Sequence, residues 1–321
     1  MKSYAVVIRT VNGGPKYARL LNSLHHQTIS PRAIFVVLPD GFQPPKEKLG
    51  TETYLYTRKG MWNQRIYGLE YAFKVASEVE YLLVCDDDIE FGIDFVEKLM
   101  DMSNDNNIDI LIPFLPQYTA PYRVLMDSIT GTNLRNKSSK YHIKICSTAG
   151  YSINNSIRDN LKLTQSGSFA CFMCKTAIVP YLSLKDELWL DATRYALPDD
   201  QVFFYKAYIG GFKLCTCVKP NYIHLDGHAG SDGERKKQMA YSSGRNYYIF
   251  WHRFLYVPQR KKNNRIWLRL AISYRIIIFS ILFGGYSILQ LDLGYVASYI
   301  RGTLNGYHFV KSKEYRNLPK L

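Results

Sequence analysis

The sequence reads Tyr81-Leu82-Leu83-Val84-Cys85 and then, without a break, Asp86-Asp87-Asp88. An apolar run that ends in three carboxylates predicts a buried strand that delivers a dense negative cluster to one edge of a sheet. Like charges this close repel, so such a cluster usually persists where a divalent cation neutralises it. Carboxylate oxygens suit Mg²⁺ or Mn²⁺. The alternative is a solvated turn before a helix around residues 93–100, where acidic side chains suit the helix dipole.

Strand and helix patterns alternate through the first hundred residues. Strands are predicted over residues 4–9, 33–38, 53–56 and 81–85, and helices over 17–27 and 64–79. This order, with short connections, predicts an α/β fold with a doubly wound, mostly parallel sheet. Ligands on such sheets bind beyond the carboxyl ends of the strands. Arg9-Thr10, Asp40 and the Asp triplet all follow strands, so we expect them on one rim.

The second half of the chain gives weaker signals. Residues 101–165 are rich in Asn, Ser and Thr, and only residues 108–113 are typical of a strand. A helix is predicted over residues 201–209, opened by Asp199-Asp200 and closed by Gly210-Gly211, with a strand over residues 212–218 after it.

Charge and hydrophobicity divide the chain into two parts. Of its 321 residues 47% are hydrophobic, enough for a substantial core. The formal net charge is +14, and after Phe250 twelve Lys and Arg residues stand against two acidic ones. We therefore expect a catalytic domain over residues 1–250 and a basic region over residues 251–321. The N-terminus lacks the pattern of a signal peptide, which predicts a cytoplasmic protein.

The longest apolar run, residues 276–289, lies in the basic region and reads IIIFSILFGGYSIL. Its fourteen residues are fewer than the ~20 that a perpendicular span needs. With Arg260-Lys261-Lys262 before it, the run is expected to lie in the interface of an anionic membrane, which places the protein at the inner face of the cell membrane. The alternative is a core helix packed on the catalytic domain. No nucleic-acid recognition module is evident, so we expect no nucleic acid partner.

Taken in order and spacing, these residues resemble a family 2, inverting glycosyltransferase with the GT-A fold. The resemblance covers about residues 4 to 250 and rests on Val6-Val7-Ile8-Arg9-Thr10, Ser23-Leu24-x-x-Gln27, Val36 to Gly41, Gly60 to Arg65 with Gly68, Asp86-Asp87-Asp88, Asp199-Asp200, His224 and Arg245-Asn246. Leu38-Pro39-Asp40 replaces the usual Asp-Asp pair, and Asp199-Asp200 replaces the usual Glu-Asp.

The resemblance implies transfer of a sugar from a nucleoside-diphosphate donor to a saccharide or lipid-linked saccharide in surface-polysaccharide biosynthesis. We expect the donor to be UDP-linked. The position of Asp200 is that of the general base, and the chemistry requires one because the acceptor hydroxyl must lose a proton as it attacks. An Asp at a helix start is also a common N-cap, which is the alternative role.

The metal site implied by the resemblance takes Asp86 and Asp88 as ligands of Mn²⁺ or Mg²⁺, with His224 completing it. His228 is the rival histidine. Asp87, between the two ligands, is expected at the nucleotide ribose or oriented by the turn.

The remaining contacts fall to donor and acceptor. Thr10 and Asp40 are expected at the nucleotide base, Arg65 at ribose or phosphate, and Arg245 or Lys236 at the leaving diphosphate. Trp189 and Asp199 are expected at the acceptor. Each has a structural alternative as a solvated charge, a helix cap or a core residue.

Two other functions compete. A sugar-nucleotide pyrophosphorylase shares the strand and helix alternation, but Asn12-Gly13-Gly14-Pro15-Lys16 is too short for its triphosphate loop and lacks the Arg. A non-catalytic basic adaptor for membranes or nucleic acid would bind without turning over nucleotide sugar. A zinc site from Cys171-x-x-Cys174 and Cys215-x-Cys217 is disfavoured, because residues three apart on a strand face opposite ways.

Overall fold

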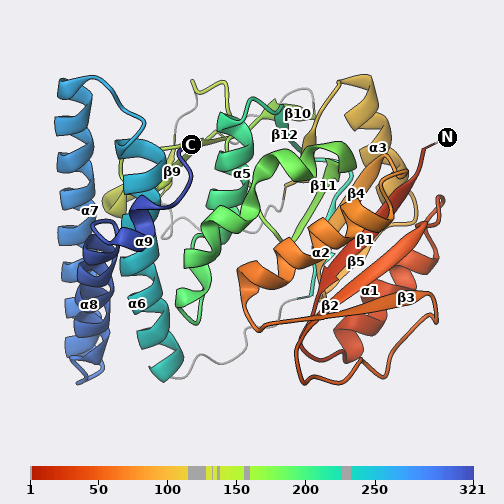
Figure 1. Ribbon diagram of the computed structural model, residues 1–321, viewed down its shortest axis with the longest axis horizontal. Helices are drawn as coiled ribbons and strands as arrows, with labels where there is room; N and C mark the ends of the chain where they lie inside the picture. The colour runs from red at the N-terminus through yellow and green to blue at the C-terminus, as the bar shows by residue number, and fades with distance from the viewer. Residues whose placement is uncertain (1, 115–127, 132, 136–137, 155–159, 226–232) are drawn as a thin grey trace. The chain divides into compact units, whose positions relative to one another are not determined.

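The computed structural model describes residues 2–114, 128–131, 133–135, 138–154, 160–225 and 233–321. The chain forms two compact units (Figure 1). The sheet unit comprises Met1–Pro116, Ile157–Lys185 and Phe203–Ala229, and the helical unit comprises Gln117–Ser156, Asp186–Val202 and Gly230–Leu321. The division falls within helix α5 (Asp199–Ile209).

An eight-stranded sheet forms the centre of the sheet unit, in the order β10-β12-β6-β11-β4-β1-β2-β3. All of these strands except β10 and β11 run in the same direction, which confirms the expected mostly parallel α/β sheet. The strands are β1 (Tyr4–Arg9), β2 (Ala33–Pro39), β3 (Glu52–Thr57), β4 (Tyr81–Asp86), β6 (Ile110–Pro113), β10 (Leu161–Leu163), β11 (Cys171–Lys175) and β12 (Leu214–Cys217).

Helices cover both faces of this sheet. Side chains of α1 (Pro15–His25) and α3 (Phe95–Asp105) join one buried cluster with alternate residues of β1 and β4, such as Val6 and Leu83. Val7 points to the opposite face. There it meets α2 (Met61–Val75), which begins three residues before the predicted start, directly after Gly60. The sheet is therefore doubly wound, as the sequence pattern predicts.

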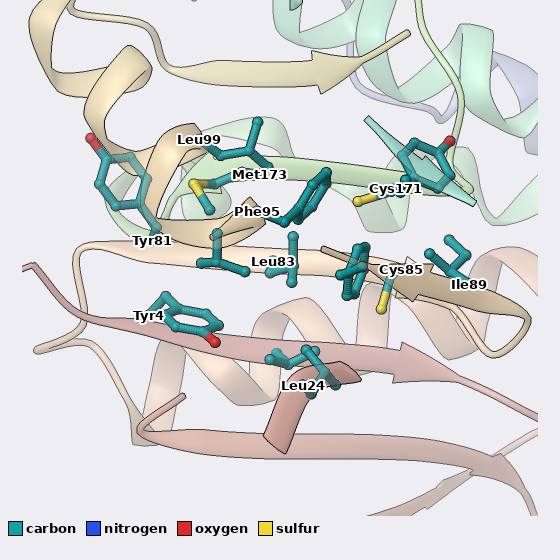
Figure 2. Packing of buried hydrophobic residues seen from close by; sticks show 14 of the residues in the cluster. Tyr4, Leu24, Tyr81, Leu83, Cys85, Ile89, Phe95, Leu99, Cys171 and Met173 are labelled. Carbon is teal, nitrogen blue, oxygen red and sulfur yellow. The ribbon is translucent and has the colours of Figure 1, made fainter. Parts of the chain in front are cut away.

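The core on the α1 and α3 face brings together segments that are distant in sequence (Figure 2). Tyr4, Leu83, Phe95 and Met173 are each at most 1% exposed. Cys85 of β4 is the register partner of Cys171 of β11. Burial raises the pKa of both thiols, so they pack as small hydrophobes. All six cysteines are free.

The helical unit contains a small three-stranded sheet and a group of helices. Its elements are β7 (Asn133–Arg135), β8 (Ile143–Ile145), β9 (Tyr151–Ile153), α6 (Gly233–Phe250), the π-helix η4 (Trp251–Tyr256), α7 (Lys262–Leu289), α8 (Gly294–Phe309) and α9 (Lys313–Arg316). Helices α6 and α8 approach so closely that a Cβ at Gly302 would lie only 2.1 Å from the Tyr241 carbonyl oxygen. The 3-10 helix η2 (Thr176–Leu182) belongs to the sheet unit, and a second one, η3 (Leu184–Ala192), follows it.

Helix α7 is longer than the apolar run suggests. It has 28 residues and is, within the described residues, the one helix long and apolar enough to cross a membrane, judged by length and composition alone. Only 22% of its most apolar window is buried, and Ile277 and Ile281 are 58% and 62% exposed. Most of the apolar surface of this helix is therefore not used by the helical unit.

Gly68 offers a test of the packing between α2 and the sheet. A Cβ there would lie 2.6 Å from Val7 Cγ1 and 2.7 Å from Val37 Cγ2, and both valines are buried. We expect Gly68→Ala to lower the free energy of unfolding by about 1–3 kcal/mol through overpacking. Gly285→Ala is the control, since open space surrounds Gly285 within α7 and alanine favours a helix by about 1 kcal/mol. Urea unfolding measures both, and equal stabilities of the two variants would contradict the packing described.

Candidate functional site

The carboxyl ends of β1, β2 and β4 form one rim of the sheet, as the parallel pairing requires. Asp86 ends β4 directly beside Arg9, its register partner on β1. Thr10 follows Arg9 and donates its backbone N–H to the Val37 carbonyl oxygen of β2 (3.2 Å). Asp40 follows β2, is exposed, and donates its N–H to Thr57 of β3 (2.8 Å). Three of the expected site segments therefore lie at this rim.

Two arginines hold the carboxylate of Asp86. Its Oδ1 accepts from the guanidinium of Arg9 at 3.2 Å and from that of Arg65 at 3.1 Å. Burial alone would raise the pKa of Asp86, but the charges and hydrogen bonds of Arg65 and Arg9 together outweigh it and leave the pKa below its ordinary value. Asp86 therefore stays ionised at neutral pH.

The second carboxylate of the triplet has a different partner. The hydroxyl of Thr10, a residue only 2% exposed, donates a short hydrogen bond to Asp87. Burial raises the pKa of Asp87, and the adjacent charges of Asp86 and Asp88 add to the rise, whereas the Thr10 hydrogen bond opposes it. A positive charge brought beside Asp87 would favour its ionised form.

Asp88 faces a histidine from a distant part of the chain. Strand β5 (Ile89–Phe91) pairs with β13 (Tyr222–His224), so that His224 lies opposite Ile89. The Nε2 atom of His224 is 3.1 Å from Asp88 Oδ1, and the Leu225 N–H donates to the Asp88 carbonyl oxygen (2.7 Å). The side chains of Asp88 and His224 are 19% and 22% exposed. The two residues expected to share a metal are thus adjacent and accessible, whereas His228 lies outside the described residues.

A carboxylate oxygen and an imidazole nitrogen in contact suit Mn²⁺, which accepts both kinds of ligand. Within the described part of the chain, no group of three or more His, Cys, Asp or Glu residues could hold a metal. A cation at Asp88 and His224 would therefore take its other ligands from a nucleotide diphosphate and water, as divalent ions at phosphate sites commonly do.

The first turn of α2 supports the rim. The Gln64 amide donates to the carbonyl oxygens of Thr10 (3.3 Å) and Val37 (3.1 Å). The next residue, Arg65, stacks its guanidinium 4.1 Å from the Phe169 ring centroid while it pairs with Asp86. Sequence reasoning assigned no role to Gln64, Phe169 or the Arg9 side chain. The one signal for Arg9 was a charge at the end of a buried strand.

The helical unit holds the other expected residues, beginning with Asp199 and Asp200 in the first turn of α5. Asp200 Oδ1 accepts from the N–H of the next residue, Gln201 (2.7 Å), and Asp199 is 7% exposed. Tyr247 lies near both carboxylates: burial raises its pKa to about 12, and the charges of Asp200 and Asp199 contribute while that of Arg275 opposes them. The Arg275 guanidinium is 4.0 Å from the Tyr247 ring centroid. The sequence did not indicate that Tyr247 and Arg275 accompany Asp200.

Three further residues that are expected at the donor or the acceptor make hydrogen bonds within the helical unit. Trp189 is 4% exposed and donates its indole N–H to Glu187 (2.7 Å). Arg245, also 4% exposed, donates to the Trp189 carbonyl oxygen and to Asn305, both at 2.9 Å. Lys236 donates to the Tyr286 hydroxyl (2.8 Å). These contacts hold the three side chains in place, and their expected roles at the donor and the acceptor stay predictions.

Known structures give a fold-level likeness. No protein-family model and no curated protein matches this sequence. A crystal structure of GalNAc-T7 with UDP, GalNAc and Mn²⁺ is similar with a TM-score of 0.50 and 14% identity, over 91% of this chain and 58% of that one. Crystalline S. aureus TarS is similar with a TM-score of 0.45 and 14% identity, over 86% of this chain and 54% of that one. The chain thus spans little more than half the length of either protein.

The GalNAc-T7 likeness agrees with the architecture described above. A large, mostly parallel central sheet precedes a C-terminal helical region, and the fold is the α/β fold of GT-A type that the sequence predicted.

The Asp86 contacts predict a pH-dependent effect of Arg65→Gln. Removing one cation from a largely buried carboxylate should lower the free energy of unfolding by about 1–3 kcal/mol at pH 7. Because the pKa of Asp86 is lowered in the folded state, this loss is present above the ordinary Asp value of 3.8 and shrinks as the pH falls through the lowered pKa. Arg19→Gln is the control, since Arg19 pairs with Glu90 on the surface and its loss costs at most about 1 kcal/mol. Urea unfolding from pH 7 to below pH 4 measures both, and a pH-independent loss for Arg65→Gln would contradict the assignment.

Proposed function

We propose that this chain is a metal-dependent, inverting glycosyltransferase that uses a nucleoside-diphosphate sugar. The observation that carries the proposal is the contact between Asp88 and His224 at a strand-end rim where Arg9, Arg65 and Thr10 hold the other two carboxylates. Such a rim is where ligands of doubly wound sheets bind. GalNAc-T7, with a similar fold, was crystallised with UDP, GalNAc and Mn²⁺.

In this proposal Asp88 and His224 hold Mn²⁺ or Mg²⁺, which neutralises the leaving diphosphate. We keep Asp86 at the metal site, as the resemblance implies. Two arginines hold its carboxylate there, and in this position Asp86 orients the triplet. Asp87, Thr10 and Asp40 bind the nucleoside, and Arg65 borders the ribose or phosphate. Among nucleoside diphosphates, we favour UDP as the carrier of the donor sugar.

Asp200 is the proposed base. Inverting transfer needs one ionised carboxylate on the acceptor side to take the hydroxyl proton. Asp200 accepts from the Gln201 N–H at the start of α5, where the helix dipole favours a negative charge. Further along the same helix, Phe203 and Phe204 pack on Phe169, whose ring carries Arg65. Asp199 is proposed to contact the acceptor, with Tyr247 and Arg275 as positioning residues.

The acceptor is proposed to be a saccharide or lipid-linked saccharide of surface-polysaccharide biosynthesis. Residues 1–250 would carry catalysis, and residues 251–321 would attach the protein to the cytoplasmic face of an anionic membrane. The exposed apolar side chains of α7 and the basic excess after Phe250 support this attachment.

The metal assignment predicts the behaviour of two variants. Asp88→Asn and His224→Ala should each weaken UDP binding in Mn²⁺ by about tenfold or more, because each removes a direct ligand. Calorimetry with and without Mn²⁺ measures this, and His25→Ala, on the exposed end of α1, is the matched control. Unchanged UDP affinity and metal dependence in both variants would rule out the assignment.

The base assignment predicts a separation of binding from turnover. Asp200→Asn should bind UDP with wild-type affinity but transfer sugar about 10²-fold more slowly or worse, since the base acts only on the acceptor proton. Product formation from a panel of nucleotide sugars gives the rate, and Asp105→Asn, at the exposed end of α3, is the control. Near-normal turnover by Asp200→Asn would remove it from the mechanism. Absence of turnover in the wild type, with binding retained, would favour the adaptor instead.

A further inference from the structure

The helical unit contains a cavity of about 640 Å³ whose lining residues all belong to that unit. They come from the end of α6 and η4, from one face of α7, and from α8 and the residues after it. Aromatic rings form much of the wall, namely Tyr248, Trp251, Tyr256 and Tyr307. The rings of Trp251 and Tyr256 stack at a centroid distance of 5.0 Å. Packed aromatic rings therefore form a large part of the cavity wall.

Two exposed cations stand at this cavity. Arg269 donates to the Tyr256 hydroxyl and lies 5.2 Å from that ring centroid. Lys311 donates to the Tyr307 hydroxyl and lies 3.7 Å from that ring centroid. Within the described residues neither cation has a carboxylate in salt-bridge distance. Their charges are thus held in place but not neutralised, which favours an anionic ligand.

Trp251 contributes ring surface to the wall. Its side chain is 3% exposed, and its indole nitrogen is buried from solvent, so the residue meets the cavity through its aromatic surface and not through its N–H. The two cations are therefore the polar groups that a ligand in this cavity would meet first.

The rest of the wall is aliphatic and continues onto the surface. Ile272 and Ile276 of α7 line the cavity, as does Leu304 of α8. Leu304 is 52% exposed and belongs, with Ile300 (43%) and Tyr307 (40%), to an apolar stripe at helical spacing on α8. An apolar chain seated against Leu304 could therefore leave the cavity along this stripe.

We propose that this cavity binds an amphiphile with a phosphate head group and an apolar chain. The phosphate contacts Arg269 and Lys311, and the chain lies on Ile272, Ile276 and Leu304. A bilayer phospholipid and a single lipid phosphate share this chemistry. The site shares no residue with the donor rim and does not require glycosyl transfer, although a lipid-linked acceptor would be one such ligand.

Calorimetry on the full-length protein tests the site with dodecyl phosphate below its micellar concentration. Inorganic phosphate and an uncharged dodecyl polyethylene glycol ether are the comparators. We expect dodecyl phosphate to bind at least about tenfold more tightly than either, because only it engages both the cations and the apolar wall. Equal binding by inorganic phosphate or by the ether, or no binding of dodecyl phosphate, overturns the proposal.

Substitutions in the cavity wall test whether dodecyl phosphate binds at the proposed site. The double variant Arg269→Gln/Lys311→Gln should lose at least about tenfold in affinity, as expected for two charge-assisted hydrogen bonds. The matched control Arg301→Gln/Lys313→Gln removes the same charge from exposed positions of α8 and α9 outside the cavity and should change affinity by less than about twofold. Equal losses in both double variants would show a general charge effect and overturn the site.

Two further measurements separate the possible outcomes. UDP binding in Mn²⁺ should be the same in all these variants, so failure of the lipid site and failure of the donor site are distinguishable. Competition between dodecyl phosphate and phosphatidylglycerol vesicles identifies the source: displacement assigns the site to bilayer phospholipid, and its absence, with dodecyl phosphate still bound, assigns it to a single lipid phosphate. Thermal unfolding of each variant verifies that the fold is intact.

Discussion

The ion pairs of Asp86 with Arg9 and Arg65 are the constraint on which the rim depends. A largely buried carboxylate must be paired, and these two cations come from β1 and from the first turn of α2. Next to Arg65, Gln64 ties the same turn to the carbonyl oxygens of Thr10 and Val37. Arg65 also rests on Phe169, so the two ion pairs connect two strands, a helix and a core ring.

This arrangement explains how three adjacent carboxylates coexist. Asp86 is neutralised by arginines, Asp87 is held by the Thr10 hydroxyl, and Asp88 faces His224 across the small β5 and β13 sheet. Each carboxylate of the triplet thus has its own partner, and the three do not form one chelating cluster. The proposed metal role falls mainly to Asp88 and His224, and Asp86 orients the set. The helical unit is built around an equivalent constraint, the buried ion pair of Glu187 and Arg253 (2.8 Å).

Local patterns predicted the elements that the fold depends on, and long-range contacts explain what they missed. The strand before Asp86 and the strands before Thr10 and Asp40 were predictable because apolar runs end in polar residues, and parallel order then brings the ends together. The pairing of Asp86 with Arg65 was not, because no local pattern encodes a contact between side chains of separate elements. The full length of α7 was not predicted, because only its apolar part, residues 276–289, stands out in the sequence. The residues before it include Arg269 and Arg275, and arginine is a good helix former, so the helix begins already at Lys262.

The most direct measurement of the central claim, a metal held between Asp88, His224 and a diphosphate, is pulsed electron paramagnetic resonance of Mn²⁺ bound to the wild-type protein with UDP. We predict hyperfine coupling of the same ion to phosphorus of the diphosphate and to one imidazole nitrogen, with the nitrogen coupling absent in His224→Ala. Phosphorus coupling without any nitrogen coupling, or nitrogen coupling that persists in His224→Ala, would contradict the claim.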